Sequence, residues 1–145
     1  MRRVLVLCTT LTLAAAPAAQ AAKPAVAFER QTLVRSAAGA QITTLPRGSG
    51  LQFDVRYTVR GVPRRWKQAT AQVFVTLWRP SAVVRFETNR AQTETGTWRW
   101  VVKGDAVQIP ATHPAGRYTM RVRVEIRHGG SRVARVLHDR RVTVR

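Results

Sequence analysis

The residues with the most evident binding chemistry are four consecutive positions, Arg64, Arg65, Trp66 and Lys67, which combine three cations with one aromatic ring. They follow a Gly-Val-Pro segment at residues 61–63, which favours a loop. Arginine binds phosphate through paired hydrogen bonds, and an exposed tryptophan stacks on bases or enters a membrane interface. These four residues are the predicted ligand-binding site, for a phosphate-rich glycan, lipid headgroups or nucleic acid. The alternative is a solvated loop whose tryptophan folds back onto the domain.

The histidines and acidic residues do not form a recognisable catalytic set. His113, His128 and His138 lack the short spacing of metal ligands. His138 adjoins Asp139, but neighbouring residues on a strand point to opposite faces, which argues against half of a catalytic triad. The glycines after residue 22 fall between predicted strands, so no phosphate-binding loop is evident. The sequence therefore predicts a protein that is not an enzyme, with no cofactor and no metal.

The tryptophans outside this loop lie on predicted strands. Trp98 and Trp100 are two residues apart, so they share one face, where burial in the core is expected and sugar stacking is the alternative. Trp78 ends a strand that has two partly apolar faces, one of which carries Phe74 and Trp78. One of these two faces is a candidate surface for a partner.

Short β-strands must position all of these residues. Residues 51–59 and 118–126 alternate apolar and polar side chains, which predicts strands with one buried face. Weaker strands are predicted over six further segments: residues 25–34, 71–78, 82–88, 97–103, 106–109 and 132–144. Turn residues separate these segments. The fold class predicted is all-β, an antiparallel β-sandwich of seven or eight strands, with a closed barrel as the alternative.

The register of the last hairpin can be predicted from its charges. A loop of residues 129–131 places Glu125 opposite Arg135 and Arg121 opposite Asp139, so opposite charges face each other twice. The same register pairs apolar side chains in the core: Val124 with Val136 and Tyr118 with Val142.

A two-residue loop would instead bring Arg135 to the core face opposite Val124, which is costly without a partner. In the preferred register His138 and Arg140 point inward. We therefore expect a bulge or the end of the core at those positions.

Residues 109–119 read Ile-Pro-Ala-Thr-His-Pro-Ala-Gly-Arg-Tyr-Thr and resemble the approach to the penultimate strand of immunoglobulin-like domains. Many secreted bacterial immunoglobulin-like modules carry a similar Pro-Ala-Gly-x-Tyr-Thr run, and here the resemblance extends from Pro114 to Ile126. It implies an immunoglobulin-like fold and a tyrosine corner, in which the Tyr118 ring lies in the core and its hydroxyl binds upstream backbone. It implies no particular activity. Antibody-type domains have a cysteine pair, which this sequence lacks.

Residues 1–21 have the three-part order of a secretory signal peptide. Arg2 and Arg3 precede an uncharged run at residues 4–16, and small residues precede a cut after residue 21, with a cut after residue 22 as the alternative. The run is too short for a membrane helix, so no transmembrane segment is expected after cleavage. We expect one secreted or periplasmic domain of residues 22–145. Loss of the two arginines lowers the formal net charge from +18 to +16, and the only cysteine, Cys8, is also removed.

These features together predict a non-catalytic binding or structural module of the bacterial cell envelope. Its expected partner is an envelope protein or an anionic envelope polymer. The alternative function is a basic polyanion-binding protein that acts on lipopolysaccharide, teichoic acid or, non-specifically, nucleic acid. The strong preference for arginine over lysine also fits GC-rich coding, so the positive charge by itself names no partner. Polyanion binding would weaken steeply with salt, and an apolar protein interface would not.

Overall fold

The structure is a computed structural model of the chain, and it describes residues 22–87, 91–92, 98–103 and 107–145. For residues 91–92 and 98–103 the description covers the backbone alone. The predicted signal peptide, residues 1–21, lies outside the described residues, as do the side chains of Trp98 and Trp100. In the described ranges the chain is all-β, with two sheets and no helix that could cross a membrane.

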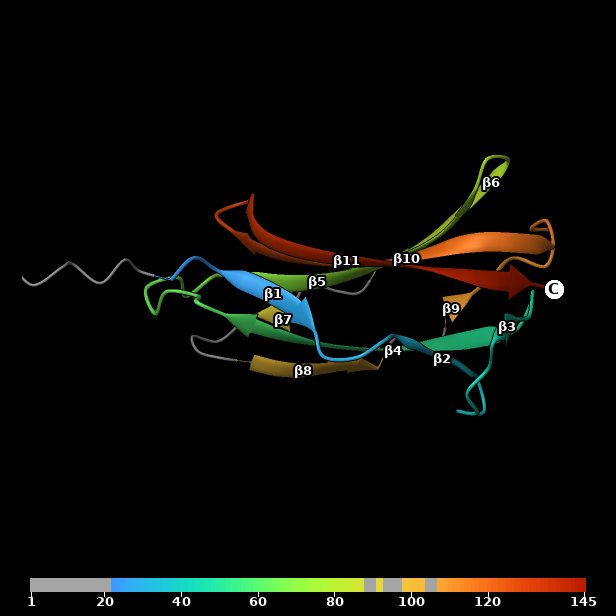
Figure 1. Cartoon of the computed structure of the whole chain (residues 1–145), viewed down its shortest axis with the longest axis horizontal. Helices are drawn as coiled ribbons and strands as arrows, with labels where there is room; N and C mark the ends of the chain where they lie inside the picture. The colour runs from blue at the N-terminus through green and yellow to red at the C-terminus, as the bar shows by residue number, and fades with distance from the viewer. Residues whose placement is uncertain (1–21, 88–90, 93–97, 104–106) are drawn as a thin grey trace, which may run out of the picture.

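The first sheet is built around one long strand, β4 (Gly50–Arg60), to which four shorter strands pair in antiparallel orientation. The register places β1 (Ala25–Phe28) and β2 (Leu33–Ser36) along one edge of β4. It places β8 (Trp98–Lys103) and β9 (Val107–Gln108) along the other edge. β4, β2 and β8 form the lower layer in Figure 1, and β1 rises from them toward the upper layer.

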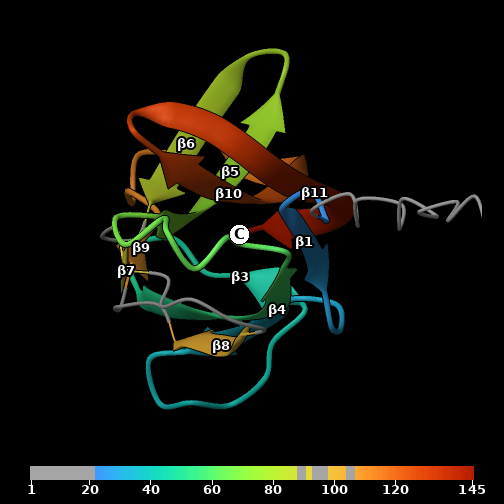
Figure 2. The same ribbon diagram turned by 90° about the vertical axis from the view of Figure 1, so that its left-hand side faces the viewer.

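The second sheet contains the two longest of the described strands. Its described strands, in spatial order, are β3 (Thr44–Leu45), β11 (Ser131–Val144), β10 (Gly116–His128), β5 (Thr70–Arg79) and β6 (Ala82–Glu87), with β7 (Ala91–Gln92) also beside β5. All pairings are antiparallel except β3 with β11. The sheet is strongly curled, and β6 rises away from the other sheet in both Figure 1 and Figure 2.

The hydrophobic core lies between the inner faces of the two sheets, because alternate residues of each strand point inward. On β4 the predicted alternation is confirmed, with five buried apolar side chains: Leu51, Phe53, Val55, Tyr57 and Val59. On β10 it is also confirmed: Tyr118, Met120, Val122, Val124 and Ile126 are buried. Burial of these side chains supplies the main driving force for folding.

The β10–β11 hairpin has the predicted register but not the predicted loop. Both opposite-charge pairs are present, including Glu125 opposite Arg135. The loop has two residues, Gly129 and Gly130, whose φ angles of 56° and 81° suit a tight hairpin turn. A shift of register after Ile126 then leaves one extra residue on β11. This bulge keeps Arg135 off the core face. The predicted three-residue loop is therefore wrong, but the predicted residue pairs are present, because the shorter loop and the bulge together give the same register.

The core is interrupted at His138 and Arg140 but does not end there, because Val142 and Val144 further along β11 are buried, and the strand has no bulge at these two positions. The expected end of the core or bulge is therefore wrong. His138 is exposed, and its ring meets the edge of Phe28 on β1 at 6.3 Å between centroids. Arg140 donates a hydrogen bond to the carbonyl oxygen of Thr32 at 3.2 Å. The segment from β1 to β2 therefore runs along this part of β11.

The single strand predicted for residues 25–34 is wrong, because the structure divides it into β1 and β2. Side-chain bonds hold the intervening residues against β4: Thr58 donates to Glu29 at 2.8 Å, and Arg30 donates to Asp54 at 2.5 Å. In all, the described residues form eleven strands, three of them only two residues long, where seven or eight were predicted.

The predicted tyrosine-corner contact is confirmed at the start of β10. The Tyr118 ring is 2% exposed, and its hydroxyl donates to the carbonyl oxygen of Pro114 at 2.6 Å. The guanidinium of Arg79 lies over the ring, 5.1 Å from its centroid, and also donates to the carbonyl oxygen of Ala115 at 2.8 Å. This contact fixes the chain entering β10, the strand on which the outward-pointing arginines lie.

Candidate functional site

The four residues predicted to bind a ligand lie together in the loop between β4 and β5, but their side chains do not share one direction. Arg64, Arg65 and Lys67 are exposed. Trp66 is partly buried against the core and stacks on His128, with 4.4 Å between ring centroids and 1° between ring planes. The ring is thus placed as in the alternative interpretation, folded back onto the domain. A ligand-binding role for the four residues stays a prediction.

A different surface, the outer face of the curled sheet, brings aromatic and basic side chains together. The pairing of β6, β5, β10 and β11 aligns outward-pointing residues in three rows. The rows are Val83, Trp78, Thr119 and Arg141; Arg85, Thr76, Arg121 and Asp139; and Glu87, Phe74, Arg123 and Leu137. Neighbours within a row are about 4.8 Å apart, and successive rows about 6.8 Å.

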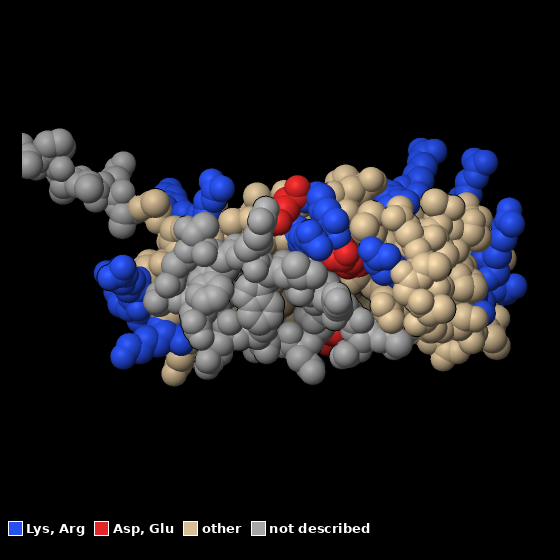
Figure 3. Space-filling view, turned by 90° about the horizontal axis from the view of Figure 1, so that it is seen from below, with Lys and Arg blue, Asp and Glu red and all other residues tan. Residues whose placement is uncertain are grey.

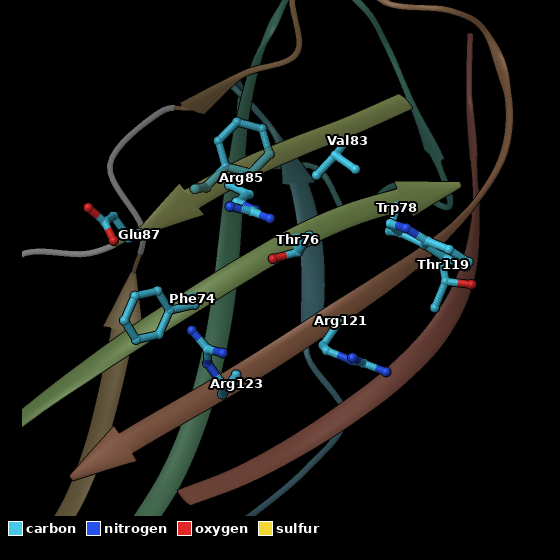
Figure 4. Close-up of a pocket in the computed structure, with 10 residues that line it drawn as sticks. Phe74, Thr76, Trp78, Val83, Arg85, Glu87, Thr119, Arg121 and Arg123 are labelled. Carbon is cyan, nitrogen blue, oxygen red and sulfur yellow. The ribbon is translucent and has the colours of Figure 1, made fainter. Parts of the chain in front are cut away.

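The part of this face on β5, β6 and β10 is hollowed into a groove of about 790 Å³, which we call the β5–β6–β10 groove. It is lined by Phe74, Thr76, Trp78, Val83, Arg85, Phe86, Glu87, Thr119, Arg121 and Arg123. Figure 4 shows these side chains on the three strands. The curl of the sheet makes the face concave, because β6 is turned away from the other sheet (Figure 1).

Exposed apolar side chains are concentrated on this outer face. Among the described residues, the large hydrophobic side chains that are exposed are Trp78 at 51%, Val83 at 45% and Leu137 at 44%. All three belong to the rows above, and Trp78 and Val83 are direct cross-strand neighbours in the groove. Concentration on one face distinguishes them from the scattered exposed apolar residues of ordinary surfaces.

Two of the three arginines in the groove are held in fixed positions. Arg121 makes two hydrogen bonds to Asp139, at 2.7 and 2.6 Å, and these bonds lower the pKa of that carboxyl group. The guanidinium of Arg123 lies 4.4 Å from the centroid of the Phe74 ring. Arg85 is exposed, and no ion pair joins it to another described residue.

Two nearly buried acids are each surrounded by three arginines. One of these groups of four residues lies on the outer face of the second sheet, and the other on the outer face of the first sheet. Glu125, on β10, lies 3.3, 3.1 and 3.8 Å from the guanidinium groups of Arg123, Arg127 and Arg132. The other acid is Asp54, on β4. Its carboxylate lies 2.5, 3.9 and 3.8 Å from the guanidinium groups of Arg30, Arg35 and Arg56. Figure 3 shows acidic atoms flanked by basic ones on the face of the first sheet. Both groups carry a surplus of positive charge.

The sequence partly anticipated the groove. The outward pair Phe74 and Trp78 was identified as one of two candidate partner faces, and Arg121 and Arg123 were expected to point outward. The sequence did not predict which strands lie beside β5, because β5 pairs with β10, a strand far away in the sequence. Arg85 could have been found from the outward positions of the strand predicted at residues 82–88.

The fold and the groove define an all-β protein with two sheets and an open aromatic and basic surface. In the described part of the chain, the histidines and acids form no group suited to a metal ion. Neither a family model nor a curated protein matches the sequence.

Two solved structures show weak likeness at the level of fold. One is the alkylpurine DNA glycosylase AlkC of Pseudomonas fluorescens, bound to DNA containing an abasic-site analogue, with a TM-score of 0.43 and 11% identity over 86% of this chain. This chain spans only 31% of that glycosylase chain. The other is an immunoglobulin-like protein of Pseudomonas aeruginosa, with a TM-score of 0.36 and 14% identity over 83% of this chain and 96% of that one.

Proposed function

We propose that this protein is a non-catalytic binding module of the bacterial envelope, with an immunoglobulin-like β-sandwich architecture, secreted or periplasmic after removal of residues 1–21. Its partner, an envelope protein or an anionic envelope polymer, binds in the β5–β6–β10 groove. The observation that carries this proposal is the half-exposed Trp78 beside fixed guanidinium groups in a concave face. Tryptophan and arginine are the residues that most often dominate binding energy at interfaces.

The architecture proposed rests on two features of the described fold. Two sheets enclose one core, and the Tyr118 hydroxyl binds upstream backbone as in a tyrosine corner. The non-catalytic assignment is supported by the engagement of the acids. Glu125, Asp54 and Asp139 are each paired with arginine, so these three carboxylates are engaged in ion pairs within the fold.

Binding to envelope fractions tests the proposal. Purified protein should sediment with bacterial envelopes at moderate salt, and Trp78→Ala should lower the bound fraction severalfold. Leu137→Ala is a matched control, because Leu137 is similarly exposed on the same sheet but does not line the groove. Equal binding by the parent protein and the Trp78→Ala variant would refute the groove as the binding surface.

A second candidate function is binding of polyanions such as lipopolysaccharide, teichoic acid or nucleic acid, without a defined groove. The observation that favours it is the surplus of arginine around both Glu125 and Asp54. Replacing Arg64, Arg65 and Lys67 by serine tests the contribution of the predicted loop. If these cations contact phosphates, the salt slope of binding should fall by several units, at about 0.9 per phosphate on duplex DNA. An unchanged slope would exclude the loop as the contact.

A further inference from the structure

We infer that the ligand of the β5–β6–β10 groove is a polysaccharide that carries carboxylate groups, a polyuronate. One sugar ring stacks on Trp78, and carboxylates bind Arg85 and the neighbouring guanidinium groups. The inference rests on the proposed function and names the class of ligand for the same groove.

The surroundings of Trp78 suit a flat sugar ring. Its neighbours in the row are Val83 and Thr119, both short side chains, and Trp78 itself is half exposed. The negative face of the indole attracts the weakly positive C–H bonds of a sugar. Thr76 and Thr119 line the groove beside it, and their hydroxyl groups can both donate to and accept from sugar hydroxyls.

The arginines of the groove are arranged to receive carboxylates. Arg121 binds Asp139 through Nε and Nη2, which leaves the Nη1 donors available. Arg123 is held by the Phe74 ring and by Glu125, and Arg85 is unpaired among the described residues. Groups fixed before binding lose less entropy when the ligand arrives. Arg121 and Arg123 already pair with Asp139 and Glu125 of the protein, so a ligand carboxylate would use Arg85 and the remaining donors of these two arginines.

The charge of the groove suits a polymer of low charge density. Its lining has three arginines and one glutamate, so two net positive charges, and two of these arginines are shared with acids outside the lining, Arg121 with Asp139 and Arg123 with Glu125. The three rows extend over about 14 Å. One strand of nucleic acid carries about four phosphates over that length, at one per 3.4 Å. Nucleic acid also calls for several stacking rings, whereas the Phe74 ring is covered by Arg123.

Calorimetric titration with oligogalacturonate tests the inference. The parent protein should bind the oligomer, and its fully methyl-esterified form, which has the same rings without charge, should bind at least tenfold more weakly. Trp78→Ala should weaken binding at least tenfold and Arg85→Gln severalfold. Two controls should bind like the parent: Leu137→Ala, and Arg60→Gln, which removes one exposed charge from the end of β4 in the other sheet. Thermal unfolding of each variant verifies that it is folded.

Three results would overturn the inference. One is tighter binding of single-stranded oligothymidylate or polyphosphate than of oligogalacturonate at the same salt. Another is equal loss from Arg60→Gln and Arg85→Gln, which would mean that diffuse charge is responsible. The last is absence of oligogalacturonate binding. If Trp78→Ala still lowers envelope binding in that case, the proposed function stands and only the ligand class is wrong. If it does not, both fail.

Discussion

Substitution of Tyr118 separates the contribution of its hydroxyl from that of its ring. Tyr118→Phe removes one hydrogen bond of 2.6 Å to the carbonyl oxygen of Pro114. Pro114 is exposed, so water can bind the freed carbonyl, and the expected cost is about 1 kcal/mol. Tyr118→Ala also removes a ring that is 2% exposed and lies beneath the Arg79 guanidinium. Its expected cost is about 3–5 kcal/mol.

Equilibrium urea unfolding measures both costs. The free energy of unfolding is extrapolated to water, and an unchanged m-value shows that the unfolded state is comparable between variants. Arg79→Ala is the control for the cation over the ring, and it should cost less than Tyr118→Ala. A Tyr118→Ala variant as stable as the parent would refute the assignment of this ring to the core.

Three further predictions concern other parts of the fold. Trp66→Ala should lower the free energy of unfolding by about 2 kcal/mol, because the ring packs on the core and on His128; an unchanged value in urea unfolding would show that the stack contributes nothing. Gly61→Ala should lower the free energy of unfolding by at least about 2 kcal/mol, since φ is 68° and the new Cβ would lie 2.6 Å from the carbonyl oxygen of Lys23. An Ala variant as stable as the parent would contradict that geometry. Burial raises the pKa of Tyr57 from 10.0 to about 12, so stability should be complete below pH 10 and should fall by up to about 3 kcal/mol as the pH rises through 12. The alkaline loss should be absent in Tyr57→Phe, and an identical loss in that variant would assign it to another group.

Sequence reasoning succeeded for the fold where local pattern decides structure. The alternation of β4 and β10 fixed which faces are buried, and the charges of Arg121 and Asp139 identified the hairpin register. The turn was missed because two glycines and a bulge produce the same pairs as a longer loop. The pairing of β3 with β11 was missed because two residues carry no pattern of their own.

The candidate site was predicted less well, because it depends on which strands are neighbours. Phe74 and Trp78 were recognisable as an outward apolar pair on one strand. Their combination with Arg121 and Arg85 requires β5 to lie between β10 and β6, which alternation alone does not specify. Conversely, the residues around Trp66 are adjacent in sequence, but the stack on His128 comes from a distant hairpin. A motif of contiguous residues therefore indicated an exposed ring that tertiary packing partly buries.

The location of the binding surface is tested most directly by oxidative footprinting of the tryptophans in the presence and absence of bacterial envelope fractions. Hydroxyl radicals should oxidise the half-exposed Trp78 readily in the free protein, and mass spectrometry measures the modified fraction. The proposed function predicts that envelopes protect Trp78 severalfold while leaving the exposed Leu137, outside the groove, unprotected. Protein that is bound to envelopes but shows the same oxidation of Trp78 as free protein would contradict the central claim.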